Sequence, residues 1–322
     1  MLVTILPFFL AARIANITDP YQNNDGQLHG LECTYDVLVN MSLSHMVNMD
    51  ETYCSMIATE LKCRPKGSDT LSCHFTNGRI VRPDTGDTRC INARNYHPIK
   101  DRFVNTDPFE IRFNSKGIEN LVVTRTTPRW RIDMIRGIVE QLNIGFELEK
   151  GYRRFIAMEN SSIGYCEVEV MMTRPGYGRR MSDLENNADL HIVFEPERPD
   201  IVPLSRAILD VQKVRYHKKC PNRKAYFFGN LADYAHGDNK LKVFMDVTSS
   251  VSHIRVSEKE LHSYTETMGV MKMNEKDKEA RLHQKISLSL KHIGNAQEAF
   301  PEIPNPASTS LHAYSNIAPE AA

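Results

Sequence analysis

The chain has 322 residues, with 40 lysines and arginines and 40 aspartates and glutamates, so its formal net charge at pH 7 is zero. Non-specific binding to nucleic acid or to an anionic membrane needs surplus positive charge, so this balance argues against both. The length is ample for a large hydrophobic core.

The amino-terminal stretch is apolar from Leu2 to Ala12, which is the length of the hydrophobic region of a secretory signal peptide. No lysine or arginine precedes it, but Ala11, Ala12 and Ala15 can supply a cleavage site. Residues 1–15 are therefore predicted to be a signal peptide. No later stretch is long enough to span a bilayer, and we expect the mature chain to be secreted and extracellular.

Two further features fit an extracellular protein. The sequons at Asn16, Asn40 and Asn160 are predicted glycosylation sites. Of the seven cysteines, five fall within the first 90 residues, which predicts local disulfide bonds. An odd number leaves at least one cysteine free or paired outside the chain. The sequence leaves this choice open among Cys33, Cys54 and Cys90.

Segments in which apolar and polar residues alternate recur along most of the chain, as expected of antiparallel strands with one wet face. The predicted strands cover residues 35–46, 55–63, 70–77, 108–114, 118–125, 153–159, 165–173, 189–195, 225–229, 241–257 and 286–293. The proline-rich stretch 300–310 is predicted to be extended and weakly ordered.

The segment around residue 68 is predicted to be a hairpin. Cys63 and Cys73 lie symmetrically about Ser68, and so do Leu61 and Phe75. A turn centred there places the two sulfurs opposite each other on adjacent strands, within bridging distance, so we predict a Cys63–Cys73 disulfide. The alternative is a partial metal site, although the spacing matches no zinc motif. Its other ligands would be Cys54 and His74.

The stretch 107–144 changes from a strand pattern to a helix pattern. Gly117 is predicted to close a tight hairpin at a position that needs positive φ. Thr127 suits a helix N-cap and Pro128 the first helical position, so residues 129–142 are predicted to form a helix. Its apolar side chains spread over roughly 200°, whereas an ordinary surface helix has a stripe nearer 100° wide. A helix surrounded by strands would bury such an arc.

No arrangement of residues for catalysis or cofactor binding stands out. The sequence lacks the Gly-x-Ser-x-Gly and His-Glu-x-x-His motifs, and its 12 histidines are scattered singly. We therefore expect no enzyme, no metal site and no cofactor, with lipid as the remaining candidate ligand.

Residues 108–170 resemble the N-terminal region of vitellogenins, which are members of the large lipid transfer protein family. The pattern "PFEIRFNSKGIENLVVTRTTPRWRIDMIRGIVEQLNI" is similar to the family's strand, glycine turn, second strand, Pro-x-Trp and Ile/Val-rich helix. The segment "FIAMENSSIGYCEVEV" follows in the same order. A looser likeness covers about residues 28–317, and residues 318–322 are expected to form a short tail.

The resemblance implies a mostly β fold, a many-stranded antiparallel β-barrel of the vitellogenin type wrapped around a central α-helix. It also implies a disulfide between Cys166 and Cys220, because both align with cysteines that the family pairs. The helix would fill the barrel, with Trp130 near its mouth. The other barrel-filling residues would be Ile135, Ile138, Val139 and Leu142.

Complete family members continue beyond this region into a helical arch and sheets that enclose lipid, and we expect neither in this sequence. The resemblance therefore implies a short vitellogenin-like protein of the lipid transport and yolk storage family, acting as a non-enzymatic, partner-binding barrel. The expected partner is a lipoprotein-type (vitellogenin) receptor or another extracellular protein. The basic residues expected to contact it are Lys116, Arg125, Lys218 and Lys219. Two alternatives stay open: a small lipid-binding or lipid transporter protein, and a barrel enzyme with a hidden site.

Overall fold

The computed structural model describes residues 31–45, 52–66, 69–83, 96–99, 107–114, 117–145, 154–173, 209–220, 222–223, 243–256, 261–273, 279–296, 298–311 and 318–319. The predictions that lie outside the described residues are the signal peptide, the strands at 189–195 and 225–229, and the roles of Asn16, Cys90 and Lys116.

The described strands form one antiparallel sheet. They are β1 (Leu31–His45), β2 (Thr52–Pro65), β3 (Thr70–Pro83), β4 (Tyr96–Ile99), β5 (Phe109–Asn114), β6 (Gly117–Thr124), β7 (Arg154–Ser161), β8 (Gly164–Thr173), β9 (Leu209–Tyr216), β10 (Asn222–Arg223), β11 (Val243–Val256), β12 (Leu261–Met273), β13 (Glu279–Asn295), β14 (Pro306–Ser310) and β15 (Ala318–Pro319). Their order across the sheet is β10-β8-β9-β11-β12-β13-β1-β2-β3-β5-β6-β14-β15, with β4 beside β3 and β7 beside β8.

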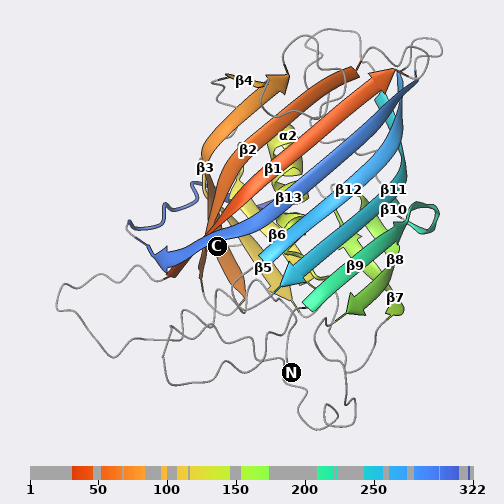
Figure 1. Ribbon diagram of the computed structural model, residues 1–322. Coiled ribbons are helices and arrows are strands. Elements are labelled where there is room, and N and C mark those ends of the chain that lie inside the picture. Colours follow the sequence, from red (N-terminus) through yellow and green to blue (C-terminus); the bar gives the residue numbers. More distant parts are fainter. Residues whose placement is uncertain are drawn as a thin grey trace, which may run out of the picture.

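The sheet curls around α2 (Arg129–Val139), the one α-helix among the described residues, which continues into a 3-10 turn, η2 (Glu140–Leu142) (Figure 1). The prediction of a mostly β, antiparallel fold with a helix at 129–142 is thus confirmed. Closure into a barrel stays a prediction. Within the described residues the ladder is an open path, which ends at β7 and β10 on one side and at β15 on the other.

The start of the helix differs from the prediction. Pro128, and not Thr127, is the N-cap, because its extended backbone (φ −66°, ψ 147°) directly precedes the first helical residue. No side chain caps the helix; Thr127 is buried and its amide donates to the carbonyl of Thr124 in the preceding turn. That hydrogen bond belongs to the turn between β6 and α2, and the first hydrogen bonds of the helix run from the amides of Arg131 and Ile132 to the Pro128 carbonyl.

The helix is buried over more than its apolar arc. Every residue from Ile132 to Val139 is buried, including Asp133 and Arg136, which pair with each other at 2.8 Å. Of the predicted barrel-filling residues, Trp130 at the helix start is partly exposed and lies against the Arg131 guanidinium. The others, Ile135, Ile138, Val139 and Leu142, are buried in the main core cluster.

The strand β12 was not predicted from the sequence. Its inward-facing positions include Ser263, Thr265 and Thr267, which are buried although they are polar. Because the expected alternation of apolar and polar residues is missing there, the segment did not resemble a strand. The interior is accordingly divided: β1, β2, β3, β5 and β6 offer apolar side chains to the helix, whereas β9, β11 and β12 offer polar ones near η2.

The proline-rich stretch 300–310 is better ordered than predicted. Its last part is β14, which pairs antiparallel with β6. Before it, the ring of Phe300 lies over the Arg64 guanidinium and edge-on to His74, on the outer face of the sheet. Arg136 of the helix donates to the carbonyl of Ser310 at 3.0 Å. These contacts fix a segment that its composition alone marked as loose.

Candidate functional site

A buried polar cluster joins the carboxyl end of the helix to β7 and β9. Its charged members are Glu140 of η2, Glu159 of β7, and Lys213 and Arg215 of β9, so two cations face two carboxylates. Lys213 and Arg215 are two residues apart, which turns both side chains to the same inward face of the strand. All four side chains are at most 3% exposed.

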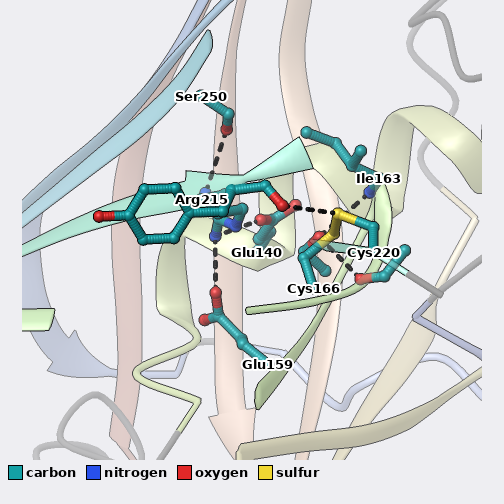
Figure 2. Close-up of a disulfide and its surroundings, with 10 residues drawn as sticks. Glu140, Glu159, Ile163, Cys166, Arg215, Cys220 and Ser250 are labelled. Carbon is teal, nitrogen blue, oxygen red and sulfur yellow. Dashed lines mark hydrogen bonds and ion pairs between the residues drawn. A yellow bond between two sulfur atoms is a disulfide. The ribbon is translucent and has the colours of Figure 1, made fainter. Parts of the chain in front are cut away.

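Arg215 connects three elements (Figure 2). Its Nη2 atom lies 2.6 Å from Glu140 Oε1 and 3.1 Å from Glu159 Oε2; the angles do not suit hydrogen bonds, so both contacts act as ion pairs. Its Nη1 atom donates to Ser252 Oγ at 2.7 Å and to Ser250 Oγ at 3.3 Å on β11. Burial acts to lower the pKa of Arg215, but the two carboxylates outweigh burial and raise it.

Lys213 holds the loop that follows the helix. Its ammonium group contacts the Glu159 carboxylate and donates to the carbonyl of Asn143 at 2.8 Å. Burial lowers the pKa of Lys213, and the Glu159 charge opposes that shift. All of these contacts are made inside the protein. Lys213 therefore has a structural role, in which it holds the loop after the helix against β7, and it is not placed to act as an acid or base towards a ligand.

The same loop fits closely against its neighbours. Asn143 Oδ1 accepts a hydrogen bond from the Ile118 amide at 3.0 Å, at the start of β6. Gly117 has φ +107°, as predicted for the hairpin, and a Cβ there would lie 2.1 Å from that oxygen. Gly145 has φ +84°, and its Cβ would lie 2.4 Å from a Glu159 oxygen. The absence of side chains at Gly117 and Gly145 thus allows the loop after the helix to pack closely against β6 and β7, beside the polar cluster.

Both predicted disulfides are present. Cys63 and Cys73 are bonded and face each other across β2 and β3, in the register that the symmetry about residue 68 predicted. Cys166 of β8 is bonded to Cys220, which follows the 3-10 turn η4 (His217–Lys219). Cys166 pairs directly with Glu159 in the sheet, so this bridge borders the polar cluster (Figure 2).

The alternative of a metal site around Cys63 is wrong, since Cys54, Cys63 and Cys73 are all disulfide-bonded and have no thiolate to offer. Cys33 is the free cysteine of the described residues, and it is buried. Elsewhere in the described part of the chain, no group of three or more histidine, cysteine, aspartate or glutamate side chains could hold a metal ion.

The predicted receptor-binding residues do not form one group in the described structure. Arg125 is exposed just after β6, and its amide donates to the Asn305 carbonyl. Lys218 and Lys219 are exposed on η4. Lys219 is ion-paired with Glu167 at 2.5 Å and lies over the Tyr216 ring, whereas Lys218 makes no ion pair with any described residue.

The two described sequons differ in their setting. Asn40 is exposed in the middle of β1, and Asn160 is exposed near the end of β7. The hydroxyl of Ser162, in the second sequon, is buried and donates to the Glu140 carboxylate. The asparagine side chains therefore face solvent, although one partner hydroxyl belongs to the polar cluster.

A small pocket lies among the described residues. A pocket beside the start of the helix is lined by residues that include Phe75, Phe109 and Ile135, and its cavity volume is about 10 Å³. That is roughly the space of one water molecule. None of the described helices has the length and the apolar composition needed to cross a bilayer.

The polar cluster was not predicted from the sequence. The signal was present in "LDVQKVRY", residues 209–216, where Lys213 and Arg215 occupy the same face as the buried Val211. Charged residues on the apolar face of a strand usually indicate that this face is solvated at a sheet edge. The burial of Lys213 and Arg215 can be explained only when the carboxylates that neutralise them are known.

Two comparisons place this fold among known proteins. A family model described as the vitellogenin N-terminal domain matches residues 57–298. Among solved structures, one titled "lipid-protein interactions in lipovitellin" superposes with a TM-score of 0.55 over 85% of this chain, at 12% sequence identity. The match covers 26% of the lipovitellin chain, so this protein corresponds to about a quarter of that structure.

Proposed function

Because this chain belongs to the vitellogenin N-terminal domain family, a family of lipid transport and storage proteins, we propose that it is a secreted, non-enzymatic binding domain. Its exposed basic residues would bind an acidic, lipoprotein-type receptor. The family is not an enzyme family and its members are typically secreted. The disulfides fit an extracellular protein, since such bonds persist in oxidising compartments.

The exposure of Lys218 is the observation that carries the receptor proposal. It projects from η4 without an ion-pair partner among the described residues, so its ammonium group can meet a carboxylate of a partner at no internal cost. Its position is well defined, because the Cys166–Cys220 bridge fixes the end of η4 to β8. Lys219 is a weaker candidate, since a receptor would compete with Glu167 for it.

The test is binding of the purified protein to a receptor ectodomain that carries acidic clusters. Lys218→Glu is expected to weaken binding at least tenfold and to reduce its dependence on salt, because opposite charges steer and hold such complexes. Arg79→Glu is the matched control: it reverses the same charge at an exposed position on β3, which is remote in the strand order. Equal affinity of the wild type and Lys218→Glu would remove this surface from the proposal.

The proposal of secretion extends to the glycans. Asn40 and Asn160 are expected to carry N-linked glycans, since both side chains are exposed. Enzymatic deglycosylation of the protein secreted from eukaryotic cells should lower its mass by two glycans or more. Asn40→Gln and Asn160→Gln should each remove one of them.

The alternative function is carriage of a small lipid. The pocket beside the start of the helix has a cavity volume of about 10 Å³, which is roughly the space of one water molecule and too small for a lipid. Native mass spectrometry of the protein purified from eukaryotic medium tests this alternative. A stoichiometric lipid adduct that survives gentle desolvation would favour it over receptor binding.

A further inference from the structure

Three cysteines lie side by side across β1, β2 and β3. Cys33 pairs directly with Cys63, and Cys63 pairs directly with Cys73. Residues in direct register on adjacent strands point to the same face of the sheet, and all three side chains are buried in the same core cluster. Cys63 therefore has a sulfur-bearing neighbour on each side, one bonded to it and one free.

Cys63 is within reach of both neighbours, whereas the outer two cysteines are not within reach of each other. Directly opposed residues have Cα atoms about 4.5–5.5 Å apart, and disulfides span Cα separations of about 4.4–6.8 Å. The existing bridge has a separation of 4.2 Å. Cys33 and Cys73 are two strand spacings apart, roughly 9–10 Å, which is beyond bridging distance.

We propose that Cys33 and the Cys63–Cys73 disulfide form a thiol–disulfide exchange site, at which the bridge moves between the β2–β3 pair and the β1–β2 pair. The Cys33 thiol loses its proton, and its thiolate attacks the sulfur of Cys63. The new Cys33–Cys63 bond forms as the Cys63–Cys73 bond breaks, and Cys73 leaves as a thiolate that takes up a proton. One disulfide replaces another, so the step needs neither an oxidant nor a reductant.

The row of three strands suits this chemistry. Attack on a disulfide proceeds along the line of the bond that breaks. The pairing places Cys33 and Cys73 on strands at opposite sides of β2, so the attacking residue and the leaving residue flank Cys63. Because the three residues share one face of the core, the exchange does not require any of them to leave it.

Burial makes the exchange slow at neutral pH. It raises the pKa of the Cys33 thiol to about 11, with the Tyr35 hydroxyl acting against this shift and the Glu32 charge adding to it. The residue opposite Cys33 on β13 is the apolar Ile293, and on β2 it is Cys63 itself. The attacking thiolate is thus scarce at pH 7, and its fraction grows about tenfold per pH unit below the pKa.

The two bridges have different mechanical consequences. The Cys63–Cys73 bond closes a segment with a sequence separation of 10 and ties only a local hairpin. The exchanged bond would join residues 33 and 63, a separation of 63 − 33 = 30, and would tie β1 to β2 in the middle of the sheet. The site therefore switches between two states: one in which a disulfide links β2 to β3, and one in which a disulfide links β1 to β2.

The first experiment maps the bridges of the folded wild-type chain. Samples are kept at pH 7 and at pH 9 without added thiol, quenched with acid, and then unfolded with N-ethylmaleimide at mildly acidic pH before peptide mapping. We expect label on Cys73 and a Cys33–Cys63 cross-linked peptide, accumulating about 100-fold faster at pH 9 than at pH 7. Label confined to Cys33 at both pH values would overturn the proposal.

The second experiment tests reach by substitution, using folded variants incubated with oxidised glutathione. Cys73→Ser should acquire a Cys33–Cys63 bridge, because its remaining sulfurs are direct neighbours. The matched control is Cys63→Ser, in which Cys33 and Cys73 should not cross-link. A Cys73→Ser protein without the Cys33–Cys63 peptide would show that the sulfurs do not meet. If this variant fails to fold, the wild-type map decides alone.

Discussion

Arg215 of β9 lies 2.6 Å from Glu140 at the carboxyl end of the helix, and both side chains are buried. This pair, with Glu159 3.1 Å from the same guanidinium, fastens the central helix to the polar part of the sheet. A buried ion pair adds little stability relative to an apolar contact of equal size, but removal of one partner leaves an uncompensated charge. The stability of the fold should therefore depend on keeping the cluster balanced.

The first prediction concerns that balance. Arg215→Met should destabilise the protein by about 3–5 kcal/mol, because Glu140 and Glu159 would then share the single charge of Lys213. The measurement is the free energy of unfolding from urea titration. Arg255→Met, at an exposed position on β11, is the control and should change stability by less than about 0.5 kcal/mol.

A double variant sharpens this test. Adding Glu140→Gln to Arg215→Met restores equal numbers of positive and negative charges, with Lys213 facing Glu159. The double variant should be more stable than Arg215→Met alone. Additive losses would mean that Arg215 acts through packing and not through charge.

The second prediction concerns Gly145. Its φ of +84° disfavours any side chain, and a Cβ would lie 2.4 Å from the buried Glu159 carboxylate. Gly145→Ala should cost about 1–3 kcal/mol of unfolding free energy. Gly294→Ala is the control, since its Cβ would meet only the ring of the exposed His292, which can move away. Equal effects of the two substitutions would contradict the close fit of the loop after the helix.

The third prediction compares the two disulfides by the length of chain that they close. The sequence separation is 54 for Cys166–Cys220 and 10 for Cys63–Cys73. In the chain-entropy model, loss of the longer link costs about 4 kcal/mol and loss of the shorter about 3 kcal/mol. Replacing Cys166 and Cys220 together by serine should therefore have the larger effect in denaturant unfolding. The reverse order would argue that strain or residual structure, and not loop closure, governs the difference.

The fourth prediction concerns acid stability. Burial acts to raise the pKa of Glu32, but hydrogen bonds and charges from Arg64 and Lys62 outweigh burial, and the pKa falls below 4.5. A carboxyl group with a lowered folded pKa contributes stability that is present above its unfolded pKa and is lost as the pH falls through the folded value. Glu32→Gln should therefore be less stable than the wild type at pH 7, with the difference shrinking below pH 4.5.

Urea midpoints at pH 7, 4.5 and 3 measure this dependence. Glu302→Gln, at an exposed position in the segment before β14, provides the control and should follow the wild type at each pH. A Glu32→Gln difference that persists unchanged at pH 3 would mean that the glutamate stabilises β1 by packing and not by its charge.

The predictions from the sequence succeeded where a structure depends on residues close together in the chain, and failed where it depends on contacts between residues far apart in the chain. The Cys63–Cys73 hairpin was predictable because a two-residue alternation on both sides of a turn determines which residues face each other. The helix at 129–142 was predictable from its local apolar period. The strand β12 was missed because the middle of its buried face carries Ser263, Thr265 and Thr267, and the first two of these donate to Gln141 at the polar end of the helix. Prolines in 300–310 suggested looseness, but Arg64 and Arg136, both distant in sequence, hold that segment.

The sequence by itself determined the parts that depend on neighbours along the chain: the alternating strands, the glycine hairpin, the amphipathic period of the helix and the symmetry of one disulfide. Only the tertiary structure decided which charges meet inside and which cysteine stays free beside a bridge. The reason is physical: a buried charge is tolerable only when its counter-charge is in place. Here the partners Glu140, Glu159 and Arg215 come from three separate elements, so no local pattern contains the information that unites them.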